Sequence, residues 1–161
     1  EQELKRDFFL LACFTGMAYA DIRGLKGSDL VTDPDGTQCI RYSRQKTGIG
    51  SIVPLLPAAQ EILKKYSLTG ETRDFKWKVM SNQKLNSGLK EIARKAGIDK
   101  PLFMHLGRHT FATTVTLSHG VPLETVSKML GHSTIKHTQL YAKIVASKVK
   151  SDMGKIAHLF Q

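Results

Sequence analysis

The stretch DLVTDPDGTQCIRYSRQKTGIGSIVPLL, residues 29–56, carries the pattern that decides the fold class. Its short segments rich in β-branched residues are separated by DPDG at 33–36 and by KTGIG at 46–50. Asp, Pro and Gly favour tight turns, so this pattern predicts a three-stranded antiparallel meander. The strands are expected near 29–32, within CIRYSR at 39–44 and within SIVPLL at 51–56.

Outside this stretch, apolar residues recur every three or four positions, which is typical of helices. The first helix is expected to run to about Thr15, where Gly16 marks its end, and a short helix should cover ADIRGL at 20–25. Further helices are expected from Pro57 to Tyr66, from Leu85 to Ala96, at 105–120, at 123–130, and from Gln139 to about Leu159. The predicted fold is therefore mainly α with one small three-stranded antiparallel β-sheet.

The composition favours a polyanionic partner. Lys and Arg number 24 against 14 Asp and Glu, which gives a formal net charge of +10. Nucleic acid is the simplest partner for such a charge, although many basic domains bind nothing specific. Two cysteines supply neither a disulfide framework nor a zinc site, and neither a signal peptide nor a run of about 20 apolar residues is visible. A cytoplasmic location is the resulting expectation.

Two short segments hold residues suited to chemistry on a phosphate. His105 and Arg108 are three apart on an expected helix and so share a face, where the fork of Arg108 suits two phosphate oxygens. His132 follows a helix end, and Tyr141 closes the same polar run. Each of these residues, taken singly, is better explained as a core or solvated side chain. His109 and His137 are interpreted as structural and solvated, respectively.

The combination of HLGRHTFAT at 105–113 with VPLETVSKMLGHSTIKHTQLY at 121–141 resembles the tyrosine recombinases, also called the phage-integrase family. That family's catalytic domain opens with a TGxRxSE-like turn, here TGMAYAD at 15–21, and has a lysine in its β-meander, here within RQKTG at 44–48. The resemblance covers almost the whole chain. Its two C-terminal motifs, in this order and at this separation, are highly specific.

The resemblance implies a role for each site residue. Tyr141 would attack a scissile DNA phosphodiester, forming a 3′-phosphotyrosyl bond and releasing a 5′-hydroxyl. Arg108, His105 and His132 would donate to the non-bridging phosphate oxygens, where a preorganised donor contributes ~3 kcal/mol. Lys46 would protonate the leaving oxygen. The family needs neither a cofactor nor a metal, because cationic side chains do that work.

One position departs from the family pattern. The family's first arginine corresponds to Ala18, which cannot donate to a phosphate. We expect Arg44 to take its place, since residues two apart on a strand share a face and Lys46 is two residues later. Arg41 should then face the opposite way, and Arg23 is a poorer candidate. The alternative is a DNA-binding relative whose catalysis is impaired.

The resemblance also bears on organisation and partners. Residues 1–161 would form a catalytic domain, with the family's N-terminal core-binding domain lying outside this sequence. Integrases of conjugative or mobilizable elements in Bacteroides-type bacteria look nearest, whereas a type IB topoisomerase or a chromosome-dimer resolvase would use the same chemistry for another task. The expected partners are double-stranded DNA, three further copies in a tetrameric synapse, and accessory DNA-bending proteins, with a monomer expected for the isolated fragment. The apolar stripe after Tyr141 could pack on its own domain or on a neighbouring protomer.

Overall fold

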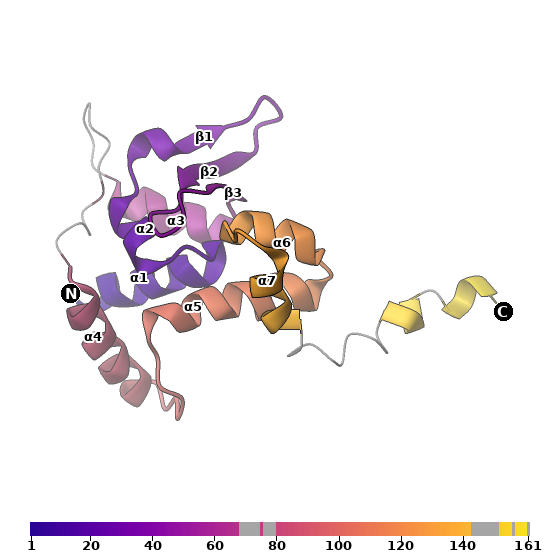
Figure 1. Ribbon diagram of the computed structural model, residues 1–161. Helices are drawn as coiled ribbons and strands as arrows, with labels where there is room; N and C mark the ends of the chain where they lie inside the picture. The colour runs from indigo at the N-terminus through magenta and orange to yellow at the C-terminus, as the bar shows by residue number, and fades with distance from the viewer. Residues whose placement is uncertain (68–74, 76–79, 143–151, 156, 161) are drawn as a thin grey trace.

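The computed structural model describes residues 1–67, 75, 80–142, 152–155 and 157–160 of the chain, and Figure 1 shows their arrangement. None of the helices in these ranges is long and apolar enough to cross a bilayer. Their elements are α1 (Gln2–Thr15), α2 (Tyr19–Gly24), η1 (Gly27–Asp29), β1 (Leu30–Thr32), β2 (Gln38–Ser43), β3 (Gly50–Pro54), α3 (Pro57–Tyr66), α4 (Asn82–Lys95), α5 (Met104–Thr110), η2 (Phe111–Thr116), η3 (Leu117–His119), α6 (Leu123–Leu130), α7 (Ile135–Ala142) and η5 (Ala157–Phe160).

The sheet has the strand order β1-β2-β3 with antiparallel pairing. Ile40 of the middle strand pairs with Leu30 on one side and with Val53 on the other. Ile40 and Val53 are fully buried, whereas Arg41 is exposed, because neighbouring side chains point to opposite faces of a strand. The predicted meander and the mainly α fold class are both confirmed.

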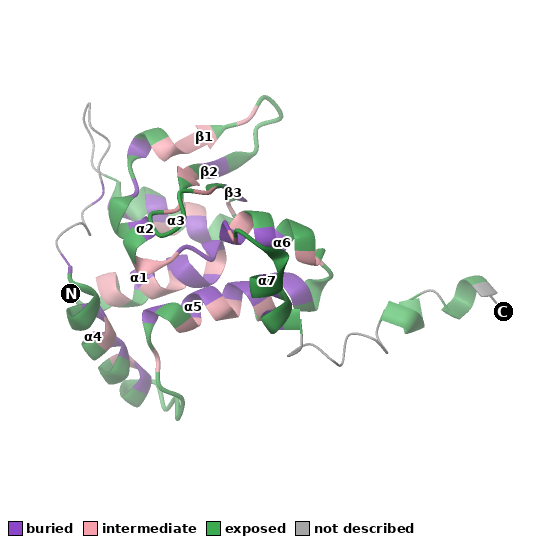
Figure 2. Ribbon diagram, viewed as in Figure 1, coloured by how far each residue is buried: buried purple, intermediate pink, exposed green. Residues whose placement is uncertain are grey.

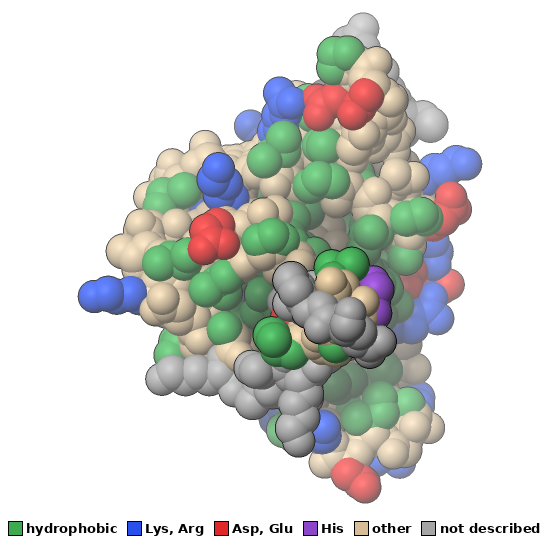
Figure 3. Space-filling model, turned by 90° about the vertical axis from the view of Figure 1, so that its right-hand side faces the viewer, with side chains coloured by type: hydrophobic (Ala, Val, Ile, Leu, Met, Phe, Trp, Pro, Cys, Tyr) green, Lys and Arg blue, Asp and Glu red, His purple; other side chains and the backbone are tan. Residues whose placement is uncertain are grey.

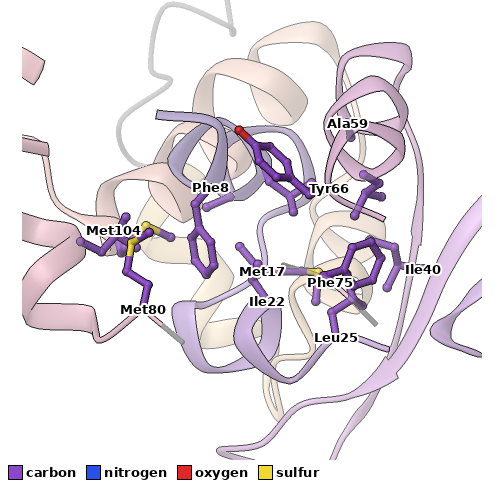
Figure 4. Packing of buried hydrophobic residues seen from close by; sticks show 14 of the residues in the cluster. Phe8, Met17, Ile22, Leu25, Ile40, Ala59, Tyr66, Phe75, Met80 and Met104 are labelled. Carbon is purple, nitrogen blue, oxygen red and sulfur yellow. The ribbon is translucent and has the colours of Figure 1, made fainter. Parts of the chain in front are cut away.

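Helix α1 lies at the centre of the fold and packs against α3, α4 and α5. Phe8 and Leu11 on this helix are fully buried, and Figure 4 shows Phe8 in one core with Met17 and Ile22. The helix ends at Thr15, as predicted, and Gly16 takes the left-handed conformation with φ of 70°. Packing in the core therefore holds the C-terminal end of α1 in place, and this sets the position of the residues that follow it.

Helix α5 can approach α1 closely because residue 107 has no side chain. A Cβ atom on Gly107 would lie 2.8 Å from the Cβ of Ala12 and 3.2 Å from the carbonyl oxygen of Phe9. Such distances are too short for carbon atoms in ordinary contact. The glycine therefore sets the depth at which the next residue, Arg108, meets the end of α1.

The helix predicted at 105–120 is not regular. Helix α5 ends at Thr110, and a wider π-helical turn, η2, follows before the short η3. The hydroxyl of Thr116 donates to the carbonyl oxygens of Phe111 and Ala112, at 2.9 and 2.8 Å. Threonine hydroxyls that bond to the preceding turn bend helices, which accounts for the irregularity. Gly120 closes the segment, as predicted, with φ of 88°.

The last predicted helix begins earlier than expected. Helix α7 starts at Ile135 rather than at Gln139. Its buried residues are Thr138 and Tyr141, so a pattern of apolar side chains could not reveal its first turn. The continuation toward Leu159 falls largely on 143–151, outside the described residues, and 157–160 form a 3-10 turn.

Candidate active site

Arg108 is buried at the junction of two helix ends. Its side chain is 2% exposed. One terminal nitrogen donates to the carbonyl oxygen of Gly16, after α1, and the other to that of Leu130, the last residue of α6, both at 2.6 Å. Carbonyl groups at helix C-termini carry partial negative charge and lack partners within the helix. Arg108 therefore joins two helices and keeps further N–H donors for a ligand, since a guanidinium has five.

Arg44 lies close to Arg108 and is also largely buried. Its side chain is 11% exposed, and its Nε atom lies 3.6 Å from a carboxylate oxygen of Asp21, whose side chain is 2% exposed. That Nε atom is buried without a hydrogen-bond partner. The stem of Arg44 passes over Gly131, where an added Cβ atom would lie 2.7 Å from Cδ of the arginine. Arg44 is thus held between α2 and the end of α6.

Strand periodicity, from which Arg44 was inferred, does not apply to it. Strand β2 ends at Ser43, so Arg44 and Lys46 belong to the hairpin connection between β2 and β3. The amide of Arg44 still donates to the carbonyl oxygen of Ile49, which fixes the base of this hairpin. Arg41, expected to face the opposite way, pairs with Asp33 at 2.6 Å in an exposed position. The placement of Arg44 therefore follows from the hairpin and from Asp21.

Four aromatic rings form a row beside these arginines. The ring centroids of His105 and His109 are 4.7 Å apart, and those of His109 and Tyr141 are 4.9 Å apart, both pairs edge to face. His132 lies almost parallel to the ring of Tyr141 at 6.3 Å, and its Nδ1 atom is 2.8 Å from the hydroxyl oxygen of Thr138. The structure therefore brings His105, His132 and Tyr141, three of the predicted site residues, close together.

The surroundings of the histidines favour their neutral forms. Burial, followed by the charges of Arg108 and Arg44, lowers the pKa of His132 to about 4. Burial also lowers the pKa of His105, with further contributions from His109, the two arginines and Lys46. Lys46 is exposed on its turn, and its charge is the smallest of these contributions. Neutral imidazoles can donate one hydrogen bond each without adding positive charge.

Two residues of the site escaped the sequence interpretation. His109 was interpreted as structural because it was placed on another face of the helix. It is one helical turn after His105 and shares that residue's face, so the four-residue spacing was the available signal. Asp21 stands one turn after Ala18, which caps α2 at its N-terminus. The available signal was an acidic residue three positions after Ala18, the position at which the family has an arginine. His137 is exposed and lies edge-on to His132 at 5.6 Å, in agreement with the solvated interpretation.

Metal ligands are not clustered in the part of the chain that the structure describes. There, no group of three or more His, Cys, Asp or Glu side chains is placed to hold an ion. The cations that converge on the site are instead Arg108 and Arg44, and the charge of Arg44 lowers the pKa of Arg108 after burial does. Two like charges held close together in a buried setting are stabilised by an anion.

The sequence of this chain is similar to those of known recombinases. The model of the phage integrase family matches residues 2–148. Tyrosine recombinase XerD of Halalkalibacterium halodurans is 29% identical over 148 residues, which cover 84% of this chain and 48% of that protein. Tyrosine recombinase XerA of Saccharolobus solfataricus is 35% identical over 129 residues, which cover 80% and 43%. The chain thus spans about half the length of these relatives.

A solved structure shares the fold of this chain. The XerH site-specific recombinase, in a post-cleavage complex with a palindromic difH substrate, superimposes with a TM-score of 0.69 at 21% identity. The match covers 92% of this chain and 44% of that one.

Proposed function

The chain belongs to the phage integrase family, and from that premise we propose that it cleaves and rejoins DNA strands through a covalent bond to Tyr141. In this reaction the phenol oxygen of Tyr141 bonds to the scissile phosphorus while the bond to the 5′-oxygen breaks. The phenol passes its proton to water, and Lys46 supplies one to the departing 5′-oxygen, so one proton is lost and one is gained. The 3′-phosphotyrosyl bond keeps the energy of the phosphodiester. A 5′-hydroxyl at a DNA strand end can therefore attack this bond, rejoin the strand and release Tyr141 without ATP.

The observation that carries this proposal is the pairing of two arginines, one buried and one largely buried, with a row of rings in which Tyr141 lies between His109 and His132. A phosphodiester brings one negative charge, and the transition state adds a second. Arg108, already fixed by two carbonyl groups, needs no reorganisation to bind it. His105 and His132 complete the donor set as neutral side chains.

Arg44 is proposed as the substitute for the arginine that Ala18 replaces. Its support is positional: the Asp21 carboxylate stands beside the guanidinium, and the buried Nε atom lacks a hydrogen-bond partner. Because Nε is buried and faces Asp21, a phosphate would be bound by the terminal nitrogens of the guanidinium. The same support weighs against a catalytically impaired DNA-binding relative, because the missing cation has a replacement.

The wider setting follows from the same premise. We propose that residues 1–161 are the catalytic domain of a longer integrase, since the matched relatives are about twice as long. Its partners would be duplex DNA, further copies in a tetrameric synapse and DNA-bending accessory proteins, and its task the integration or excision of a mobile element of Bacteroides type.

On the face in Figure 3, hydrophobic side chains occupy much of the middle and Lys and Arg lie mainly toward the rim. Binding should weaken steeply with salt, because phosphate contacts release counterions.

A nicked suicide half-site tests the chemistry, because it traps the covalent adduct. Wild-type chain should form a protein–DNA adduct, and Tyr141→Phe should form none. Arg44→Ala should slow adduct formation about 10²- to 10³-fold, the usual cost of losing one preorganised donor. Arg41→Ala is the matched control, an exposed arginine of β2 that pairs with Asp33 and lies three residues before Arg44, and it should stay within about threefold of wild type.

The outcomes separate the alternatives. No adduct with wild-type chain, on half-sites that it binds, would favour the DNA-binding relative. An adduct that persists in Tyr141→Phe would remove the tyrosine as nucleophile. Arg44→Ala at the wild-type rate would leave the replacement of Ala18 to another cation. Relaxation of plasmids that lack a target site would indicate a topoisomerase.

A further inference from the structure

Helix α7 carries Tyr141 but has few buried attachments to the rest of the protein. Of its eight residues, Thr138 and Tyr141 are the buried ones. Figure 2 shows most of the helix as exposed, and Leu140, next to Tyr141, is 62% exposed. So short a helix is not stable in isolation. The contacts of these two side chains therefore matter most for where Tyr141 is held, and Tyr141 also belongs to the apolar cluster that contains Phe111 and Leu130.

The contact of Thr138 is local. Its hydroxyl oxygen lies 2.8 Å from Nδ1 of His132, a residue just ahead of the same helix. This interaction orients the imidazole of His132 against α7, and that ring in turn lies parallel to the ring of Tyr141. The His132–Thr138 interaction joins the two ends of this segment, but it involves no residue of α5.

The contact of Tyr141 with His109 does link separate elements. His109 belongs to α5, and its ring meets the ring of Tyr141 at 4.9 Å and 81°. Edge-to-face pairs at this separation are favourable and directional, because the positive edge of one ring meets the negative face of the other. On its other side, His109 contacts His105 at 4.7 Å. His109 is thus the aromatic link between the helix of the phosphate ligands and the tyrosine.

We propose that His109 is a positioning residue, whose imidazole holds the phenol ring of Tyr141 in line with His105 and Arg108 before DNA binds. The inference rests on the proposed role of Tyr141 as nucleophile. Its physical basis is orientation: a reacting group that is already placed avoids a loss of freedom during the reaction. Burial and the charge of Arg108 lower the pKa of His109, so the imidazole does this as an uncharged ring.

A measurement without DNA tests the position of the ring directly. Tetranitromethane nitrates accessible tyrosines, and peptide mass spectrometry reports the rate at Tyr141, which is 6% exposed. His109→Ala should raise this rate about two- to tenfold, the range expected from one aromatic pair, and His109→Phe should keep it low. His119→Ala, which removes an exposed histidine of η3, is the matched control and should nitrate as wild type does.

A second measurement connects the position to the reaction. On the nicked half-site, His109→Ala should slow single-turnover adduct formation by about two- to tenfold while the affinity for DNA stays unchanged. His109→Phe should restore the rate, because it keeps an aromatic ring. A residue needed only for folding would instead lower the thermal midpoint and DNA affinity together. Should His109→Ala unfold, His109→Gln keeps the bulk and polarity without the ring and takes its place.

Two results would overturn the inference. The first is a His109→Ala variant, or His109→Gln in its place, with wild-type rates of nitration and cleavage. The second is a His109→Phe variant that cleaves as slowly as His109→Ala. If wild-type chain forms no adduct, the proposed function of Tyr141 fails. The nitration rates then still show whether His109 holds the ring.

Discussion

Replacing Gly131 with alanine should cost more than its backbone conformation explains. Gly131 has φ of 59° at the end of α6, where an alanine costs about 1 kcal/mol. The new Cβ atom would also lie 2.7 Å from Cδ and 3.0 Å from Cγ of Arg44, and 3.3 Å from the hydroxyl oxygen of Ser51. Ordinary contact needs about 3.5 Å, so the stem of Arg44 must move by roughly 1 Å.

That movement has two consequences. It pulls Arg44 from Asp21, whose carboxylate is buried, so we expect a total loss of about 2–3 kcal/mol in the free energy of unfolding. A displacement of roughly 1 Å can also cost about 10²-fold in rate. Gly120→Ala is the matched control: this glycine also ends a helical segment, with φ of 88°, and has no atom within 4 Å of the added carbon.

Denaturant unfolding and the suicide half-site measure both effects. Gly131→Ala should lose at least about 1 kcal/mol more than Gly120→Ala. In an Arg44→Ala background the extra loss should disappear, because the clashing stem is gone. Equal losses for the two glycines in both backgrounds, with an unchanged cleavage rate, would refute the placement of Arg44 over Gly131.

Three further changes test the framework of the site. A histidine in the unfolded chain titrates near pH 6.5, whereas folded His132 stays neutral to about pH 4. Stability should therefore fall between those values as the pH is lowered, by on the order of 2 kcal/mol, and His132→Asn should flatten this dependence in denaturant unfolding. Asp7→Ala should cost about 2 kcal/mol in the same assay, because the hydroxyl of Tyr66, which donates to this buried carboxylate at 2.8 Å, loses its acceptor. Gly107→Ala should lower the thermal midpoint, since its methyl group would lie 2.8 Å from that of Ala12, a cost of about 1–3 kcal/mol; an unchanged midpoint would contradict the close approach of α5 to α1.

Local patterns in the sequence predicted most of the helices and strands and a set of candidate site residues. Turn residues and spacing located the β-meander and the helix end at Gly16, because these signals act over a few neighbouring positions. The motifs around Arg108 and Tyr141 predicted the site residues that the structure brings together. The predictions were wrong where polar side chains set the local structure. The start of α7 was placed too late, and the threonine-rich turn η2 was predicted as regular helix.

The neighbours of the candidate residues depend on contacts between segments that are distant in the chain. Arg44 reaches Asp21 and Gly131 because the hairpin, α2 and the end of α6 converge, and no periodicity within one segment encodes such a meeting. His109 contacts Tyr141 for a similar reason, since α5 and α7 are separated by the whole of α6 in the chain. Contacts of this kind depend on how deeply helices approach one another, which side-chain volume and burial set across the entire core.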